Sequence, residues 1–126
     1  TDDTRDSAAI QLVRDLQARG AIIKAYDPAA KPKGLGDVAL CNCLPEAWAG
    51  ADAAVIATEW DEFRKMNLAE LARQLKKPVL VDFRNLFNLR QARAAGLSYY
   101  SLGRATVRNA RQRRSTKTKI KLTAIA

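Results

Sequence analysis

Apolar and polar positions along the chain follow two patterns, helical spacing in some segments and short uninterrupted apolar runs in others. The first helical segment begins after Asp6 or Ser7, either of which can cap a helix, and Gly20 is placed to end it. The same spacing predicts further helices at 45–49, at 68–77 behind an Asn cap, and at 89–95. The apolar runs predict strands at 21–26, 38–43, 53–58, 79–81 and 97–102.

Strands that alternate with helices of this length are typical of βαβ units. We therefore predict an α/β fold, a three-layer Rossmann-like parallel sheet with helices on both faces. In such sheets ligands bind at the carboxyl edge, where the carboxyl ends of the strands meet. Three predicted strands end there in polar groups, in the sequences YDP (26–28), TEW (58–60) and DFRN (82–85).

Arg84 is the strongest candidate for ligand binding, because a guanidinium presents a fork of donors to phosphate oxygens and keeps its charge. The alternative is a surface ion pair with Asp82 or another neighbour. Asp82 itself is expected to accept hydrogen bonds at the turn, and Asn85 suits a turn or a helix N-cap. Arg5 is a second candidate, because a cation near the start of a helix opposes the helix dipole unless an anion lies nearby.

Other conspicuous residues have simpler structural explanations. Trp60 and Phe63 are three apart, so on a helical turn they share a face and are predicted to pack into the core. No GxGxxG sequence occurs anywhere in the chain, so Asp27 is assigned to a turn rather than to a ribose. Cys41 and Cys43 have no visible activating group, and we predict that they are buried.

The net charge of +9 comes from one end of the chain. Residues 104–126 contain eight Lys or Arg and no acid, whereas residues 1–103 contain fourteen Lys or Arg against thirteen Asp or Glu. A tail of this composition is typical of a disordered, solubilising end, and we predict no nucleic-acid partner. The alternative is a non-enzymatic module that binds nucleic-acid phosphates through the tail.

Composition excludes several classes of site. The chain contains no His, which rules out a His-based triad or a typical zinc site, and we assign no metal ligand and no catalytic residue. No apolar run reaches about 18 residues, so no membrane partner is expected. The cysteine usage indicates a reduced, cytoplasmic setting. A receiver-like signalling domain would carry paired acids at the end of its first strand, whereas Asp2 and Asp3 precede a helix.

Five sequence motifs occur in a familiar order, namely TDDTRDS, YDP, GADAAVIATEWDEF, VDFRN and YYSLGR. Together they resemble the C-terminal, UDP-binding domain of the UDP-glucose/GDP-mannose dehydrogenase family. Two positions depart from the family pattern, since Asp6 stands where Glu is usual and Phe83 replaces Gly. We expect a UDP-binding domain at 1–104 and a basic C-terminal tail at 105–126.

The resemblance implies an activity for the whole protein. Members of the family oxidise the C6 alcohol of a nucleotide sugar to a carboxylate in two NAD-dependent steps. The resemblance is closest to members that convert UDP-glucose to UDP-glucuronate, and members that use GDP-mannose or UDP-N-acetyl-mannosamine remain alternatives. By resemblance Arg84 contacts the UDP part of the substrate, and Arg5 reaches the NAD, which is held mainly by an N-terminal domain absent from this chain.

The resemblance also implies partners and a missing strand. The expected partners are a UDP-sugar, the rest of the dehydrogenase chain and further subunits of a homodimer or larger oligomer. Neither cysteine aligns with the family nucleophile, so the chain alone is expected to be inactive. In the family a strand precedes Thr-Asp-Asp, and without it the sheet would have a gap between the strands at 21–26 and 53–58. The alternating sequence KIKLTAIA at 119–126 can fill that gap.

Overall fold

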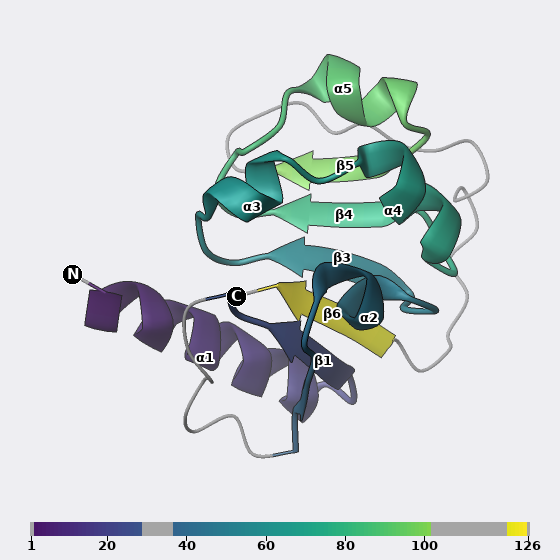
Figure 1. The fold of residues 1–126 in the computed structure, drawn as a ribbon. Coiled ribbons are helices and arrows are strands. Elements are labelled where there is room, and N and C mark those ends of the chain that lie inside the picture. The colour runs from purple at the N-terminus through teal and green to yellow at the C-terminus, as the bar shows by residue number, and fades with distance from the viewer. Residues whose placement is uncertain (1, 29–36, 102–120, 126) are drawn as a thin grey trace.

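The computed structural model describes residues 2–28, 37–101 and 121–125, with side chains for 8–28 and 37–101 (Figure 1). Its strands form one six-stranded sheet in the order β2-β1-β6-β3-β4-β5, and all neighbouring strands are parallel. The strands are β1 (Ile22–Tyr26), β2 (Ala39–Leu40), β3 (Ala53–Ile56), β4 (Val79–Asp82), β5 (Ser98–Ser101) and β6 (Lys121–Ile125). The helices are α1 (Asp2–Ala18), α2 (Leu44–Trp48), α3 (Asp61–Arg64), α4 (Leu68–Gln74) and α5 (Leu89–Ala94).

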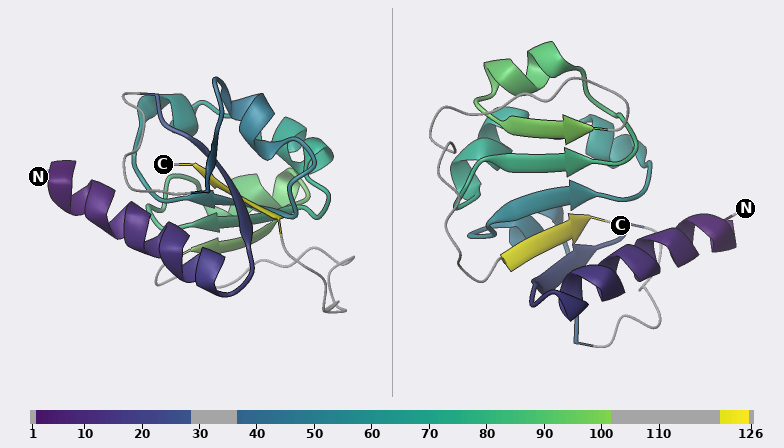
Figure 2. Two further views of the ribbon diagram at one scale, coloured as in Figure 1. Left: turned by 90° about the horizontal axis from the view of Figure 1, so that it is seen from below. Right: turned by 180° about the vertical axis from the view of Figure 1, so that it is seen from behind.

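Helices lie on both faces of the sheet, as predicted for a three-layer α/β fold. Helix α1 lies on one face beside β1, whereas α2, α3 and α4 cover the opposite face (Figure 2). Val13 of α1 and Ile23 of β1 form the centre of a small apolar cluster between them. No described helix is long and apolar enough to cross a membrane.

The larger apolar core lies on the face that carries α2, α3 and α4. Its fully buried side chains include Ile56 and Leu80 from neighbouring strands, and Phe63 and Leu71 from the helices above them. Burying a side chain of this size stabilises the fold by about 1.5–3 kcal/mol. Strand β3 is buried at all of its positions and is a continuous apolar run rather than an alternating one, which is typical of a parallel sheet.

Side-chain caps set the starts of two helices, α4 and α5. Asn67 caps α4 as predicted, because its side chain accepts a hydrogen bond of 3.0 Å from the backbone N–H of Glu70. Asn88 and Gln91 form a capping box at the start of α5. The expected start of α1 at Asp6 or Ser7 is wrong, because the helix already begins at Asp2. Acidic residues in a first turn interact favourably with the helix dipole, which is consistent with the longer helix.

The prediction that both cysteines are buried is also wrong. Cys43 is exposed and Cys41 only partly buried, and neither forms a disulfide. They follow β2, a two-residue strand at the edge of the sheet that pairs only with β1. Burial of Cys41, although partial, raises the pKa of its thiol above the usual value.

Strand β6 occupies the gap that was expected in the middle of the sheet. Its five residues pair with β1 on one side, from Ile22↔Lys121 to Tyr26↔Ile125, and with β3 on the other. This confirms the hypothesis that the C-terminal KIKLTAIA sequence fills the missing position. The backbone donors and acceptors of two flanking strands are thereby satisfied in the interior of the sheet.

We expect Thr123→Pro to lower the free energy of unfolding by about 3 kcal/mol, because proline cannot donate a ladder hydrogen bond in a strand paired on both sides. Thr123→Ala keeps the backbone N–H, and its cost should stay within about 1 kcal/mol. Urea unfolding followed by circular dichroism compares both variants with the parent chain. Equal midpoints for the two variants would contradict the central position of β6.

Candidate functional site

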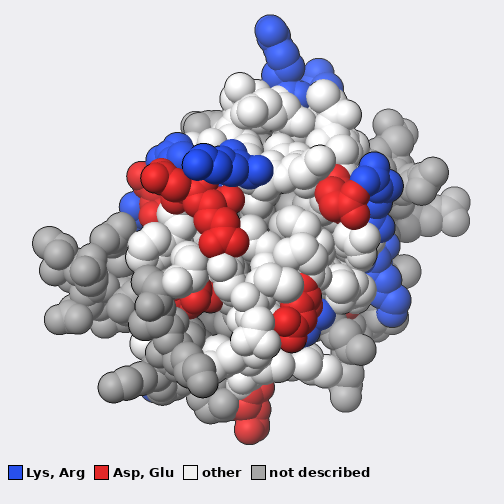
Figure 3. Space-filling model, viewed as in Figure 1, with Lys and Arg blue, Asp and Glu red and all other residues white. Residues whose placement is uncertain are grey.

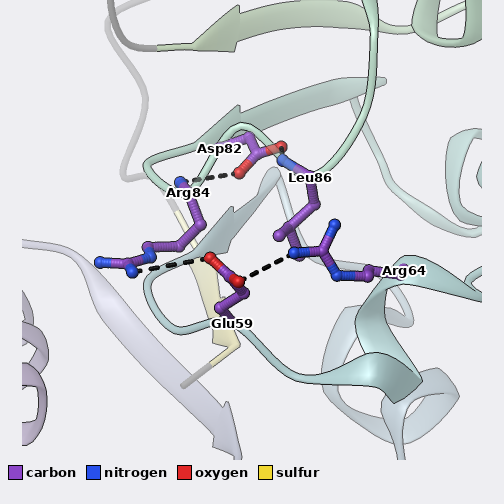
Figure 4. Close-up of polar contacts among 5 residues, drawn as sticks. All are labelled: Glu59, Arg64, Asp82, Arg84 and Leu86. Atoms are coloured by element: carbon purple, nitrogen blue, oxygen red, sulfur yellow. Dashed lines mark hydrogen bonds and ion pairs between the residues drawn. The ribbon is translucent and has the colours of Figure 1, made fainter.

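The polar residues that follow β3 and β4 come together at the carboxyl edge of the sheet (Figure 4). The backbone N–H of Phe83 donates a hydrogen bond of 3.0 Å to the carbonyl of Ile56, so β3 and β4 remain in contact up to the turn. Arg84 follows directly, and its side chain is 35% exposed. The turn therefore presents the Arg84 side chain at the edge where a ligand would approach.

Asp82 stabilises this turn through hydrogen bonds to its buried side chain. Its side chain is fully buried and accepts hydrogen bonds from the backbone N–H of Arg84 at 2.9 Å and of Leu86 at 2.8 Å. The Tyr99 hydroxyl donates a third hydrogen bond, at 2.7 Å. Between these donors, Asn85 adopts the left-handed region with φ 54°, which asparagine tolerates in turns. The expectation that Asp82 accepts hydrogen bonds at the turn is confirmed.

Glu59 links two arginines above the turn. One of its carboxylate oxygens lies 2.8 Å from Nη2 of Arg64, and the other lies 3.6 Å from Nη2 of Arg84. Arg84 thus has Glu59 rather than Asp82 as its ion-pair partner within the described residues. All three side chains are partly exposed, and ion pairs of this kind contribute about 0.2–1 kcal/mol each. A pairing this weak leaves Arg84 able to bind an anion.

Helix α3 carries a mixed charge cluster beside these residues, as the red and blue side chains over α3 show (Figure 3). The prediction that Trp60 packs into the core together with Phe63 is wrong for Trp60. Phe63 is fully buried, but Trp60 is 36% exposed. Trp60 precedes the helix with an extended backbone, so the two residues do not share a helical face.

Tyr26, at the end of β1, ties α3 to the sheet. Its hydroxyl donates a hydrogen bond of 2.7 Å to Glu62, and its ring lies against Phe63 with ring centroids 6.3 Å apart. The hydrogen bond to Glu62 and, after it, burial raise the pKa of Tyr26 to about 12, because both disfavour the phenolate. The three strands that end in polar groups therefore meet around α3.

Two hydroxyl groups at the carboxyl edge are buried without a hydrogen-bond partner in the described part of the chain. They belong to Thr58, just after β3, and to Ser101, which is the register partner of Asp82 on β5. Thr58 was included among the polar strand ends predicted from the sequence, but sequence reasoning missed Ser101 and Arg64. Nothing in the sequence distinguishes Arg64 from other surface arginines, because its relation to Glu59 depends on the short turn of α3.

Arg5, the second sequence candidate, lies near the start of α1, and its side chain is outside the described part of the structure. The N-terminal end of α1 extends past the carboxyl edge of the sheet (Figures 1 and 2). The backbone of Arg5 is therefore on the same side of the molecule as Arg84. Among the described residues, no group of three or more His, Cys, Asp or Glu side chains is arranged to hold a metal ion.

The Asp82 network generates a stability prediction. Asp82→Ala removes a buried acceptor from three donors, so we expect it to lower the free energy of unfolding by about 3 kcal/mol or more. Asp15→Ala is the matched control, because Asp15 is exposed on α1 and accepts a hydrogen bond from the exposed side chain of Gln11. Its expected cost is about 0.5 kcal/mol. Similar urea midpoints for both variants would contradict the structural role of Asp82.

The Tyr26–Glu62 pair generates a pH prediction. Because the folded-state pKa of Tyr26 lies above its ordinary value of 10.0, the stabilisation is complete below about pH 10 and is lost as the pH rises to about 12. In Glu62→Gln the pKa of Tyr26 should fall back toward 10.0, and the loss of stability over this pH range should become smaller. Tyrosinate absorbance, with Tyr26→Phe to assign the signal, measures the shift. An unchanged Tyr26 titration in Glu62→Gln would show that Glu62 does not cause the raised pKa of Tyr26.

Comparisons with known proteins find relatives that match most of the chain. The sequence profile of the UDP-glucose/GDP-mannose dehydrogenase family, UDP binding domain, matches residues 1–89. UDP-glucose 6-dehydrogenase TuaD of Bacillus subtilis (strain 168) is 41% identical over 112 residues, which are 86% of this chain and 24% of that protein. The UDP-glucose 6-dehydrogenase of Rhizobium meliloti (strain 1021) is 41% identical over 107 residues, which are 82% of this chain and 24% of that protein. The UDP-glucose 6-dehydrogenase of Rickettsia conorii (strain ATCC VR-613 / Malish 7) is 34% identical over 108 residues, which are 82% of this chain and 25% of that protein.

The chain spans about a quarter of the length of these relatives. The matched region contains α1, the strands up to β4 and the turn that carries Arg84. These matches do not favour the receiver-like or the nucleic-acid-binding alternative. The chain belongs to the UDP-glucose/GDP-mannose dehydrogenase family and contains the UDP-binding domain of that family.

Proposed function

We propose that the chain is the nucleotide-sugar-binding domain of a UDP-glucose 6-dehydrogenase and that Arg84 binds the UDP part of the substrate. The observation that carries this proposal is the position of Arg84 at the carboxyl edge, on a turn fixed by the buried Asp82. A guanidinium there offers several N–H donors to phosphate or ribose oxygens, and its ion pair with Glu59 is long, at 3.6 Å.

The proposal extends to the reaction of the whole enzyme. Such an enzyme oxidises the C6 alcohol of UDP-glucose to the carboxylate of UDP-glucuronate, and the oxidant in our proposal is NAD. The sequence contains no GxGxxG fingerprint of the kind that binds a dinucleotide, which supports a main NAD site outside this domain. NAD would be held mainly by other domains of the dehydrogenase, with Arg5 as a contact from this chain.

The proposed partners follow from this assignment. The UDP-binding unit at 1–104 would work with a UDP-sugar, with the remaining dehydrogenase domains and with further subunits in a homodimer or larger oligomer, in the cytoplasm. The tail at 105–126 would be needed for the fold as well, because it contains β6. Without the other domains, we propose that this chain has no dehydrogenase activity.

The test of the proposed function is UDP binding by the chain, measured by isothermal titration calorimetry. Arg84→Ala should weaken the affinity by about ten- to a hundredfold, since a hydrogen bond to a charged group contributes about 1.5–3 kcal/mol. Arg84→Lys should recover only part of this loss, because it keeps the charge but not the fork of donors. Arg73→Ala is the matched control, because it removes one positive charge, as Arg84→Ala does, and Arg73 pairs with Glu70 on α4.

Two outcomes would contradict the proposal. Unchanged UDP affinity in Arg84→Ala would show that Arg84 binds another ligand or none. Tighter binding of GDP than of UDP would favour the GDP-mannose members of the family instead.

A further inference from the structure

Glu59 stands between two guanidinium groups, and each of them faces a different oxygen of its carboxylate. Figure 4 shows Arg84 on one side of Glu59 and Arg64 on the other. The contact with Arg64 is 2.8 Å, the length of a charge-assisted hydrogen bond, whereas the contact with Arg84 is 3.6 Å, which is too long for one. The carboxylate is therefore held by Arg64 and only loosely associated with Arg84.

Two features place Arg64 away from Arg84. Arg64 is at the end of α3, and it lines a hollow of about 340 Å³ together with Met66, Phe87 and residues of α5. Arg84 instead extends from the turn after β4, on the opposite side of Glu59 (Figure 4). The hydrogen bond to Arg64 therefore holds the Glu59 carboxylate from the side opposite Arg84 (Figure 4).

We propose that Arg64 is a positioning residue for nucleotide binding, which holds the Glu59 carboxylate away from Arg84 and so leaves the Arg84 donors to a diphosphate. This inference rests on the proposed function. If Arg64 is removed, Arg84 is the remaining ion-pair partner of Glu59 among the described residues. The carboxylate then competes with the diphosphate for the same donors, and it also repels the negative charge of the ligand.

The size of the effect follows from the strength of an exposed ion pair. The side chains of Glu59, Arg64 and Arg84 are 41%, 47% and 35% exposed, so solvent screens their interactions. A pair of this kind that must be broken before the ligand binds lowers the affinity by about two- to fivefold. The loss should become smaller as salt is added, because the Debye length falls to about 3 Å at 1 M ionic strength.

The experiment is a double-mutant cycle on the 126-residue chain, with UDP as the probe and calorimetry as the readout. Arg64→Ala should weaken UDP binding about two- to fivefold, and Arg64→Lys should weaken it less, because lysine still holds the carboxylate. Glu59→Gln should bind UDP at least as well as the parent chain. In the double variant Glu59→Gln with Arg64→Ala, the affinity should return to that of Glu59→Gln alone.

Arg73→Ala again serves as the matched control, because it removes one positive charge and one ion pair with a glutamate at a distance from this site. Its UDP affinity should equal that of the parent chain. The melting temperature of each variant shows whether it is folded under the conditions of the titration.

The outcomes separate this inference from the proposed function. Unchanged UDP binding in Arg64→Ala would overturn the positioning role. A double variant that binds UDP as weakly as Arg64→Ala would also overturn it, because this result means that Arg64 contacts UDP itself. Weaker binding in Glu59→Gln would also overturn it, because Glu59 would then support Arg84 rather than compete with the ligand. UDP binding that survives Arg84→Ala would overturn both the proposed function and the inference.

Discussion

The carboxyl edge of this molecule depends on one buried carboxylate. Asp82 is at the end of a strand in the interior of the sheet, where a buried polar group is stable only if hydrogen-bond partners surround it. Two backbone N–H groups of the following turn and the hydroxyl of Tyr99 satisfy this requirement. The path of residues 83–86 is therefore determined from inside the protein, and the direction of the Arg84 side chain is a consequence of that path.

The site combines this buried network with an exposed layer of ion pairs that behaves differently. Contacts of Glu59 with its two arginines are in solvent, so each is weak and can be exchanged for a contact with a ligand at little cost. A buried scaffold with exposed, weakly paired charges above it is suited to reversible binding of an anion. For the same reason, substitution of the buried Asp82 is expected to lower the stability of the fold, whereas substitution of Arg84 or Arg64 is expected to lower the affinity for the ligand.

Much of the fold was predictable because its signals are local. Apolar runs and caps such as Asn67 indicate strands and helix ends without knowledge of the tertiary structure, and the resemblance of the motifs led to Arg84. Trp60 and Cys43 were predicted incorrectly, because their exposure depends on which elements cover them. The pairing of Arg64 with Glu59 was also out of reach, since a helix of four residues leaves almost no periodic signal. For Arg84 and Arg5 the predicted ligand contacts remain predictions.

The position of β6 has a consequence for how the protein is made. The strand at the centre of the sheet is the last of the six to leave the ribosome, after the strands on both sides of it. Until then β1 and β3 lack the strand that lies between them in the folded sheet, and any pairing of β2 with β1 or of β3 with β4 and β5 leaves an open edge that can pair with other chains. This interval is when a holding chaperone has the most exposed strand edge to protect. A synonymous codon change that slows translation just before 121–125 lengthens the interval without altering a single residue.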